Sequence, residues 1–179
     1  RVEVANAEFG TGFLVAPNIV LTNYHVVKDV ISKKHSFSDI SLRFDFKKLH
    51  SSRTDLEGTV YHLAKNWLVG YDTDETTTNL DYALLRLAKT PEKRGFINIP
   101  DIKDDFSSNY RKAAPLFIVQ HPEGTPLKLA LDTESIIDIN KRQSRLYYKT
   151  ITEPGSSGSP CFNNYWDLIA LHRGGLKDI

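Results

Sequence analysis

The sequence predicts an all-β chain, and three observations carry this prediction. Short apolar or alternating runs recur along the 179 residues, turn-forming residues separate these runs, and no segment offers a long amphipathic helical stripe. Period-two runs of about four to eight residues with turns between them are typical of strands in a sandwich or barrel. The only helix that we expect is about one turn over residues 24–28.

The predicted strands follow one another along the chain. Residues 13–15 and 19–21 form the first two, because the turn formers Pro17 and Asn18 separate them. Residues 40–46 alternate between apolar and polar side chains, as a half-buried strand does. By the same criteria we expect strands at residues 59–63, 82–87, 116–120, 127–131, 146–151 and 168–172. Residues 30–39 and 72–79 are expected to be exposed loops.

A polar stretch marked by prolines, residues 88–114, separates two groups of predicted strands. We therefore expect an N-terminal β unit over residues 1–88, a linker over residues 89–113 and a C-terminal β unit over residues 114–179, which together make one domain. Because the chain starts at Arg1 and contains no methionine, we expect it to be part of a longer protein.

Composition excludes several classes of partner. A net charge of +1 gives no case for nucleic acid, and no apolar run approaches the roughly 20 residues that cross a membrane. The single cysteine, Cys161, favours a reducing compartment, so the predicted location is cytoplasmic. Next to Phe162, this thiol is expected to be buried. The six histidines are scattered without the spacing of paired ligands, so we expect neither a metal nor another cofactor.

Three local signatures occur in an order that indicates chemistry. GTGFLVAPNIVLTNYHVV contains His25, NLDYALLRL contains Asp81, and TEPGSSGSPCF contains three serines on a glycine-rich bend. A serine nucleophile needs a base within hydrogen-bond reach, a histidine can take and return its proton, and a carboxylate fixes the orientation of the imidazole. Each signature alone could be structural. Together, in the order histidine, aspartate, serine, they favour a catalytic triad.

These motifs resemble those of trypsin-like serine peptidases with the chymotrypsin fold, and most of all the bacterial glutamyl endopeptidase and HtrA-like branches. The resemblance implies two six-stranded antiparallel β-barrels with the active site in the cleft between them. It also implies a serine endopeptidase that works through an acyl-enzyme. It assigns Ser157 as the nucleophile, His25 as the base and Asp81 as its orienting carboxylate, with the amides of Gly155 and Ser157 as the oxyanion hole.

The same resemblance points to a specificity pocket. Thr152 and His172 match residues that bind an acidic substrate side chain in glutamyl endopeptidases, so cleavage after Glu or Asp is expected. Arg173 could add positive potential, and the strand that ends at Gly174 should pair with the substrate backbone. In the other interpretation, His172 packs in a mainly apolar pocket. Ser156 stands where trypsins carry an aspartate, which argues against trypsin-style zymogen activation.

Two other functions stay open at this point. The chain could be a non-catalytic module that binds an extended peptide, or a peptidase that is latent until a fused regulatory domain activates it. In each case the expected partner is a protein or peptide, and neither nucleic acid nor a membrane is expected.

Overall fold

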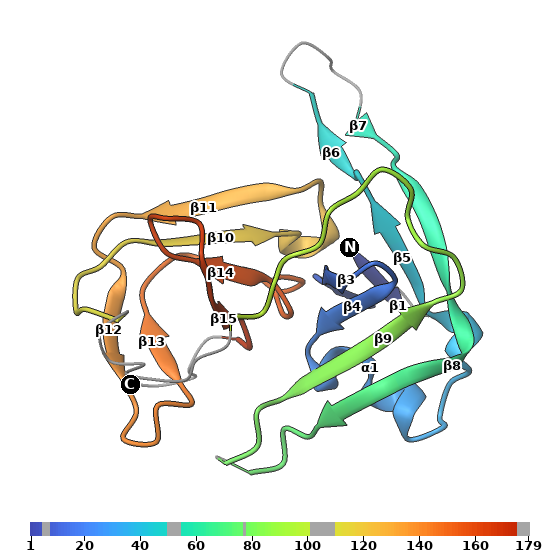
Figure 1. Cartoon of the computed structure of the whole chain (residues 1–179), viewed down its shortest axis with the longest axis horizontal. Helices are drawn as coiled ribbons and strands as arrows, with labels where there is room; N and C mark the ends of the chain where they lie inside the picture. Colours follow the sequence, from blue (N-terminus) through green and yellow to red (C-terminus); the bar gives the residue numbers. More distant parts are fainter. Residues whose placement is uncertain (5–7, 50–54, 77, 101–109, 175–179) are drawn as a thin grey trace.

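The computed structural model describes residues 1–4, 8–49, 55–76, 78–100 and 110–174, and it confirms the all-β class. Figure 1 shows two groups of antiparallel strands side by side, the first coloured blue to green and the second yellow to red. Residues 88–115 lie between the last strand of the first group and the first strand of the second. The exact division into 1–88, 89–113 and 114–179 stays a prediction.

The first group is a curled sheet of seven strands in the order β2-β1-β5-β8-β9-β4-β3. All of its strand pairs are antiparallel. Its strands are β1 (Val2–Val4), β2 (Glu8–Gly10), β3 (Phe13–Ala16), β4 (Ile19–Thr22), β5 (Ser41–Phe44), β8 (Thr59–Asp72) and β9 (Tyr82–Leu87). A separate short hairpin, β6 (Lys47–Lys48) with β7 (Asp55–Leu56), projects from it (Figure 1). The sheet thus has one strand more than the six that the family resemblance implied.

The second group contains a four-stranded sheet and a separate strand pair. The sheet has the order β11-β10-β14-β15, which leaves β15 at one edge. Its strands are β10 (Leu116–Gln120), β11 (Lys128–Asp132), β14 (Pro160–Phe162) and β15 (Leu168–Leu171). The separate pair is β12 (Ile136–Ile139) with β13 (Leu146–Tyr148).

Each group of strands has its own apolar core. In β9 the side chains of Ala83, Leu85 and Leu87 are buried, and they alternate with partly exposed neighbours, as the period of a strand requires. They pack with Val20 and Val27 in the first core. The second core is smaller and is built on the buried Leu116, Ile118 and Cys161. The expected burial of Cys161 is therefore confirmed.

Two elements are longer than the sequence predicted. The helix α1 (Tyr24–Ile31) has eight residues rather than about one turn, because Val27 and Val30 lie on the same helical face and both are buried. It reaches into the segment expected to be a loop, which also contains the 3₁₀ turn η1 (Phe37–Asp39). Strand β8 continues to Asp72, well beyond residue 63, although its second half alternates poorly.

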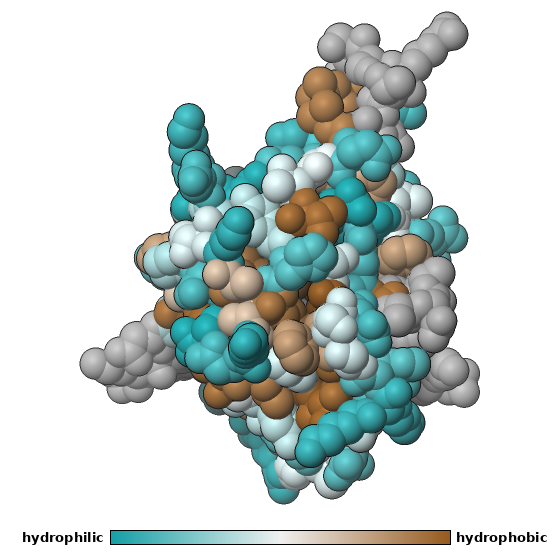
Figure 2. Space-filling model, turned by 90° about the vertical axis from the view of Figure 1, so that its right-hand side faces the viewer, coloured by the Kyte–Doolittle hydropathy of each residue, from teal (hydrophilic) through white to brown (hydrophobic). Residues whose placement is uncertain are grey.

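The surface is mixed in character. Figure 2 shows the face on which β8 lies, with apolar side chains interspersed among hydrophilic ones. Val60, Val69 and Tyr71 are exposed on β8 itself. Among the described residues, no helix is long and apolar enough to cross a membrane.

Candidate active site

His25 and Asp81 lie in direct contact. His25 is the second residue of α1, and Asp81 immediately precedes β9. One carboxylate oxygen of Asp81, Oδ2, is 2.8 Å from His25 Nδ1, and the other, Oδ1, accepts the backbone N–H of His25 at 3.1 Å. The first N–H groups of a helix have no acceptor within the helix, so a carboxylate satisfies one of them favourably. Asp81 therefore fixes both the start of α1 and the orientation of the imidazole.

Asp81 is also hydrogen-bonded through its own backbone N–H and carbonyl. It is 0% exposed, its N–H donates to Thr73 O at 3.1 Å, and its carbonyl accepts the side-chain amide of Asn23 at 2.8 Å. Its φ of 57° is in the left-handed region, which Asp tolerates better than most residues. The preceding loop is closed by the Asp72 carboxylate, which accepts the N–H of Leu80 at 2.7 Å.

The segment GSSGSP forms a tight turn, in which Gly155 and Gly158 both have positive φ, 91° and 86°. Two bonds tie this turn to the first group of strands: the N–H of Thr11 donates to Ser157 O at 2.7 Å, and the hydroxyl of Thr11 donates to Gly155 O at 2.9 Å. A third ties it to the end of β15, where Gly158 N–H donates to His172 O at 2.9 Å.

The serines of this turn differ in environment. Ser156 is 0% exposed, and its Oγ accepts the N–H of Glu153 at 3.4 Å, so its hydroxyl is part of the turn. Ser159 is also buried and donates to Ser156 O at 2.6 Å. Ser157 is partly exposed. Among the described residues, the backbone N–H groups of Gly155 and Ser157 have no hydrogen-bond acceptor, so both can donate to an incoming oxygen.

Arg173 contacts the site in two ways. Its Nε donates to Asp81 Oδ2 at 3.0 Å, the same oxygen that lies against His25 Nδ1. Its carbonyl accepts the hydroxyl of Ser157 at 3.3 Å. In the described part of the chain, Ser157 Oγ makes this bond and none to His25. The structure thus joins His25 to Asp81 directly, while Ser157 is joined to Asp81 through Arg173.

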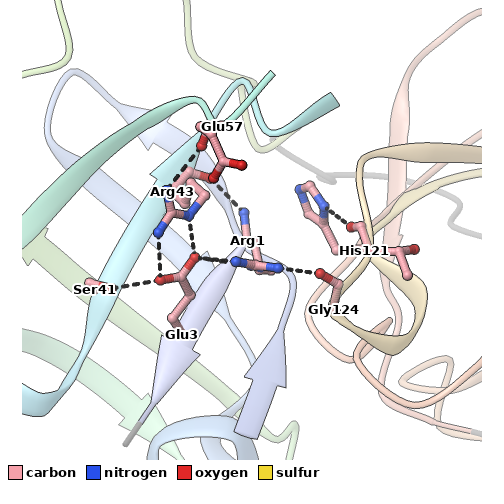
Figure 3. Close-up of polar contacts among 8 residues, drawn as sticks. Arg1, Glu3, Ser41, Arg43, Glu57, His121 and Gly124 are labelled. Atoms are coloured by element: carbon pink, nitrogen blue, oxygen red, sulfur yellow. Dashed lines mark hydrogen bonds and ion pairs between the residues drawn. The ribbon is translucent and has the colours of Figure 1, made fainter. Parts of the chain in front are cut away.

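Arg1, Glu3 and Arg43 form a partly buried ionic cluster (Figure 3). Glu3 Oε1 lies 2.6 Å from a guanidinium nitrogen of Arg1 and 2.5 Å from Arg43 Nε. Burial opposes ionisation of Glu3, but the hydrogen bonds from Arg43 and Arg1 outweigh it and lower its pKa to about 2. The guanidinium of Arg1 also stacks on Phe9 and Phe46, with its central carbon 4.8 and 4.3 Å from the ring centres.

This cluster supports the turn that carries Ser157. The other end of the Arg1 guanidinium donates to Gly124 O in the 3₁₀ turn η3 (Pro122–Gly124), as Figure 3 shows. A Cβ atom added to Gly155 would lie 2.7 Å from His121 O and 2.9 Å from Gly124 N. Only glycine fits so close to η3, and its positive φ makes the same demand. η3 therefore packs directly against Gly155, and Arg1 holds η3 through Gly124 O.

The predicted pocket residue His172 follows β15 and is 3% exposed. Its Nδ1 is hydrogen-bonded to the hydroxyl of Tyr148. Burial, together with the charge of His25, lowers the pKa of His172 to about 4, so its imidazole is neutral near pH 7. The Tyr148 hydroxyl also lies 3.8 Å from Cys161 Sγ. Burial raises the pKa of that thiol to about 12, which makes Cys161 an inert core residue.

A cavity of about 820 Å³ opens beside His25, between the two groups of strands. Arg173 and Gly174 line it, whereas Thr152 and His172 do not. Within the described ranges, no three His, Cys, Asp or Glu side chains are grouped as a metal site requires. The absence of a cofactor stays a prediction.

Several contacts of the site were not predicted from the sequence. Tyr148 was assigned to a strand without a role, Arg145 was not singled out although it lines the cavity, and Arg1 is far from the site in sequence. Alternation along residues 146–148 could indicate which side chains point inward. It could not indicate that their partners come from residue 172 or from the cavity beside His25.

Sequence comparison assigns the family. The model of the trypsin-like peptidase domain matches residues 10–171, which include the three motifs and nearly all of the strands. The chain belongs to this family. As a trypsin-like peptidase domain, it resembles the protein y4fB of Sinorhizobium fredii, with 24% identity over 187 residues that cover 97% of this chain and 26% of that protein. It also resembles a protein named as a probable serine protease in Lysobacter enzymogenes, with 26% identity over 192 residues.

This trypsin-like domain spans little more than a quarter of those relatives, since it covers 26% and 29% of their lengths. Among solved structures it is similar to Deg5, with a TM-score of 0.65, 18% identity, and coverage of 97% of this chain and 77% of Deg5. It is equally similar to the scabies mite inactivated protease paralogue S-I1, with a TM-score of 0.65, 18% identity, and coverage of 94% and 77%. At this level of identity the likeness shows the fold alone, and an inactivated paralogue shares it.

We expect the fold to lose stability on mild acidification, because His121 and His172 are buried. Burial lowers the pKa of both imidazoles to about 4 in the folded chain, whereas histidine in an unfolded chain titrates near 6.5. Between about pH 6.5 and about pH 4 the unfolded chain therefore binds protons that the folded chain does not. The free energy of unfolding then decreases as the pH falls through this window, which urea unfolding across it measures.

Two variants identify the source of this slope. His172→Asn should flatten it, because the variant has one fewer buried imidazole, whereas His62→Asn changes an exposed histidine and should leave it as in the wild type. A free energy of unfolding that stays constant between about pH 6.5 and about pH 4 would contradict the assignment of both buried imidazoles.

Proposed function

We propose that this trypsin-like domain is a serine endopeptidase with Ser157 as nucleophile, His25 as general base and Asp81 as the orienting carboxylate. The observation that carries the proposal is that the buried Asp81 carboxylate contacts His25 twice, at the ring nitrogen Nδ1 and at the backbone N–H. A surface histidine in a structural role needs no such double contact with a fully buried charge, which is costly to bury. An imidazole held this way keeps its Nε2 free to act as a base.

The chemistry follows the usual two steps of acyl transfer. Ser157 Oγ attacks the substrate carbonyl carbon and gives its proton to His25 Nε2, while the carbonyl oxygen becomes an oxyanion. The unpaired N–H groups of Gly155 and Ser157 would stabilise that oxyanion. His25 then returns the proton to the leaving amine as the peptide C–N bond breaks. A water molecule, activated by His25, hydrolyses the ester and regenerates the Ser157 hydroxyl.

In the resting structure Ser157 Oγ donates to Arg173 O, so it has to rotate toward His25 before it attacks. Catalytic hydrogen bonds often form only in the substrate complex. The same observation favours the second candidate, a peptidase that is latent until another part of a longer protein, or the substrate, breaks the Ser157–Arg173 contact. The much greater length of the relatives is compatible with attached domains.

Labelling with a fluorophosphonate tests the nucleophile. The wild-type protein should form a covalent adduct on Ser157, and Ser157→Ala should abolish both the adduct and peptide turnover, the latter by about 10⁴-fold or more. Ser156→Ala is the matched control, because Ser156 is the neighbouring but fully buried hydroxyl, and it should still be labelled. The measurement is intact-mass spectrometry over time.

The outcomes separate the candidate functions. An adduct that persists in Ser157→Ala would contradict the assignment. A domain that is labelled only as part of a longer protein would support latency. A domain that binds peptide but is labelled in neither form would support a non-catalytic binding module.

We further propose a preference for Glu or Asp at the acyl residue, the residue whose carbonyl is attacked. Support comes from the neutral His172, whose Nδ1 is held by the Tyr148 hydroxyl. When that hydroxyl donates to Nδ1, the opposite nitrogen carries the hydrogen and can donate to a substrate carboxylate, together with the Thr152 hydroxyl. Neither residue lines the large cavity, so the acyl side chain would bind outside it.

A peptide series that differs only at the acyl residue tests this preference. Glu and Asp should give values of kcat/KM about tenfold or more above Leu and Phe, because a hydrogen bond to a charged group contributes about 1.5–3 kcal/mol. Tyr148→Phe should reduce this ratio, since it removes the partner that orients His172. Preferred cleavage after Leu or Phe would contradict the proposal and favour a packing role for His172.

A further inference from the structure

The large cavity beside His25 is lined by apolar and basic side chains. Leu84 of β9 lines one side, and Leu146 of β13 and Leu171 of β15 line the other. Three of its lining side chains are basic: His25, Arg145 and Arg173. None of the described side chains that line it is a carboxylate. A space of about 820 Å³ with this lining accommodates several residues of an extended peptide.

Arg145 has no counter-ion in the described part of the chain. It is partly buried, and its guanidinium donates to a backbone oxygen, that of Asn79. No ion pair joins it to a described carboxylate. Burial lowers its pKa, and the neighbouring charge of Arg173 lowers it further. A cation that is partly removed from water without a counter-ion is destabilised, and an anionic group placed beside it would remove this penalty.

The nearby acidic side chains are already engaged. Asp72 lies close enough to influence Arg145 electrostatically, but its carboxylate accepts the N–H groups of Thr73 and Leu80 and the amide of Asn79. Asp81 is fully buried, and its carboxylate binds His25 and Arg173. Neither carboxylate presents an oxygen to the cavity that satisfies Arg145.

The backbone beside the cavity offers a way to align a peptide with Arg145. β15 is the edge strand of its sheet, and its residues Ile169 and Leu171 line the cavity. An edge strand can accept an added strand from an extended ligand. The Tyr110 hydroxyl donates to Ile169 O at 3.0 Å, so the ligand would pair with the segment that follows, Leu171 to Gly174, which lies next to Ser157 through the bond to Arg173 O.

From these observations we infer that Arg145, assisted by Arg173, binds a carboxylate side chain of the peptide substrate at the second, third or fourth residue on the acyl side of the scissile bond. The substrate class is therefore a peptide with an acidic side chain close to bulky apolar ones, which contact the apolar lining. This inference rests on the proposed endopeptidase function. It differs from the acyl-residue preference, which involves Thr152 and His172 outside the cavity.

Paired peptides test the inference directly. With the acyl residue held constant, Glu and its neutral isostere Gln are compared at each of the three positions, one at a time. At one position, wild-type protein should prefer Glu by about tenfold or more, as expected for a charge-assisted hydrogen bond. The preference should decrease at high salt, because the charges are partly exposed.

Two variants separate Arg145 from general charge. Arg145→Gln should reduce the Glu-to-Gln ratio to about one. Arg142→Gln removes the same charge three residues away in the same β12–β13 turn, where Arg142 is exposed and does not line the cavity, and should keep the ratio. Arg145→Lys should give an intermediate ratio, and thermal unfolding of each variant verifies that it is folded.

Binding measurements keep the inference independent of turnover. The same peptides are titrated by fluorescence anisotropy into Ser157→Ala protein with and without Arg145→Gln. A Glu preference that depends on Arg145 supports the inference even when wild-type protein fails to be labelled by the fluorophosphonate, a result that would count against the proposed catalysis alone. Equal binding of Glu and Gln peptides at all three positions, or a preference that persists in Arg145→Gln, would overturn it.

Discussion

The site depends on one buried carboxylate. Asp81 is fully excluded from solvent, so the fold has to supply its oxygens with donors. It does so with the backbone and the ring of His25 and with the guanidinium of Arg173. These donors come from the start of α1 and from the end of β15, in different groups of strands. Satisfying one buried charge therefore sets the position of α1, the orientation of the imidazole and the contact between the two groups.

The turn that carries Ser157 is positioned by a second set of constraints. Arg1 reaches η3, and η3 leaves room only for a glycine at position 155. Thr11 holds the turn to the first group of strands through both its N–H and its hydroxyl. The two unpaired N–H groups thus lie on a backbone that is fixed before any substrate binds. Such preorganisation is what makes a set of donors effective for a developing negative charge.

Much of this could be predicted from the sequence, because local pattern determines strands and motif order determines the candidate triad. Period-two runs located β4 and β9 well, since their side chains are alternately buried. β1 was missed because a run of three residues carries little pattern, and the second half of β8 because its apolar residues 67–69 are consecutive rather than alternating. Arg173 was expected to add positive potential for the substrate, and the sequence did not indicate that its guanidinium also binds Asp81. Contacts such as this one, or those of Tyr148 and Arg145, join residues distant in sequence and follow only from tertiary packing.

Arg173 connects the proposed catalytic residues with the cavity that would bind the peptide. It shares Asp81 Oδ2 with His25, accepts the Ser157 hydroxyl on its carbonyl, and lines the cavity with a side chain that is 37% exposed. A peptide that pairs with this segment would compete for the Arg173 carbonyl and so release Ser157. Substrate binding and alignment of the nucleophile would then be one event, which is a form of induced fit.

The proposed mechanism depends on the Asp81 carboxylate, which through His25 would make Ser157 a nucleophile. The most direct measurement is kcat for one peptide substrate with wild-type protein and with Asp81→Asn, an isosteric change, beside Asp167→Asn as an exposed control. We expect Asp81→Asn to lower kcat by about 10⁴-fold, because the amide cannot hold the same tautomer of His25. The control should stay near the wild-type rate. An Asp81→Asn protein that is folded and turns over within about tenfold of wild type would contradict this role of Asp81.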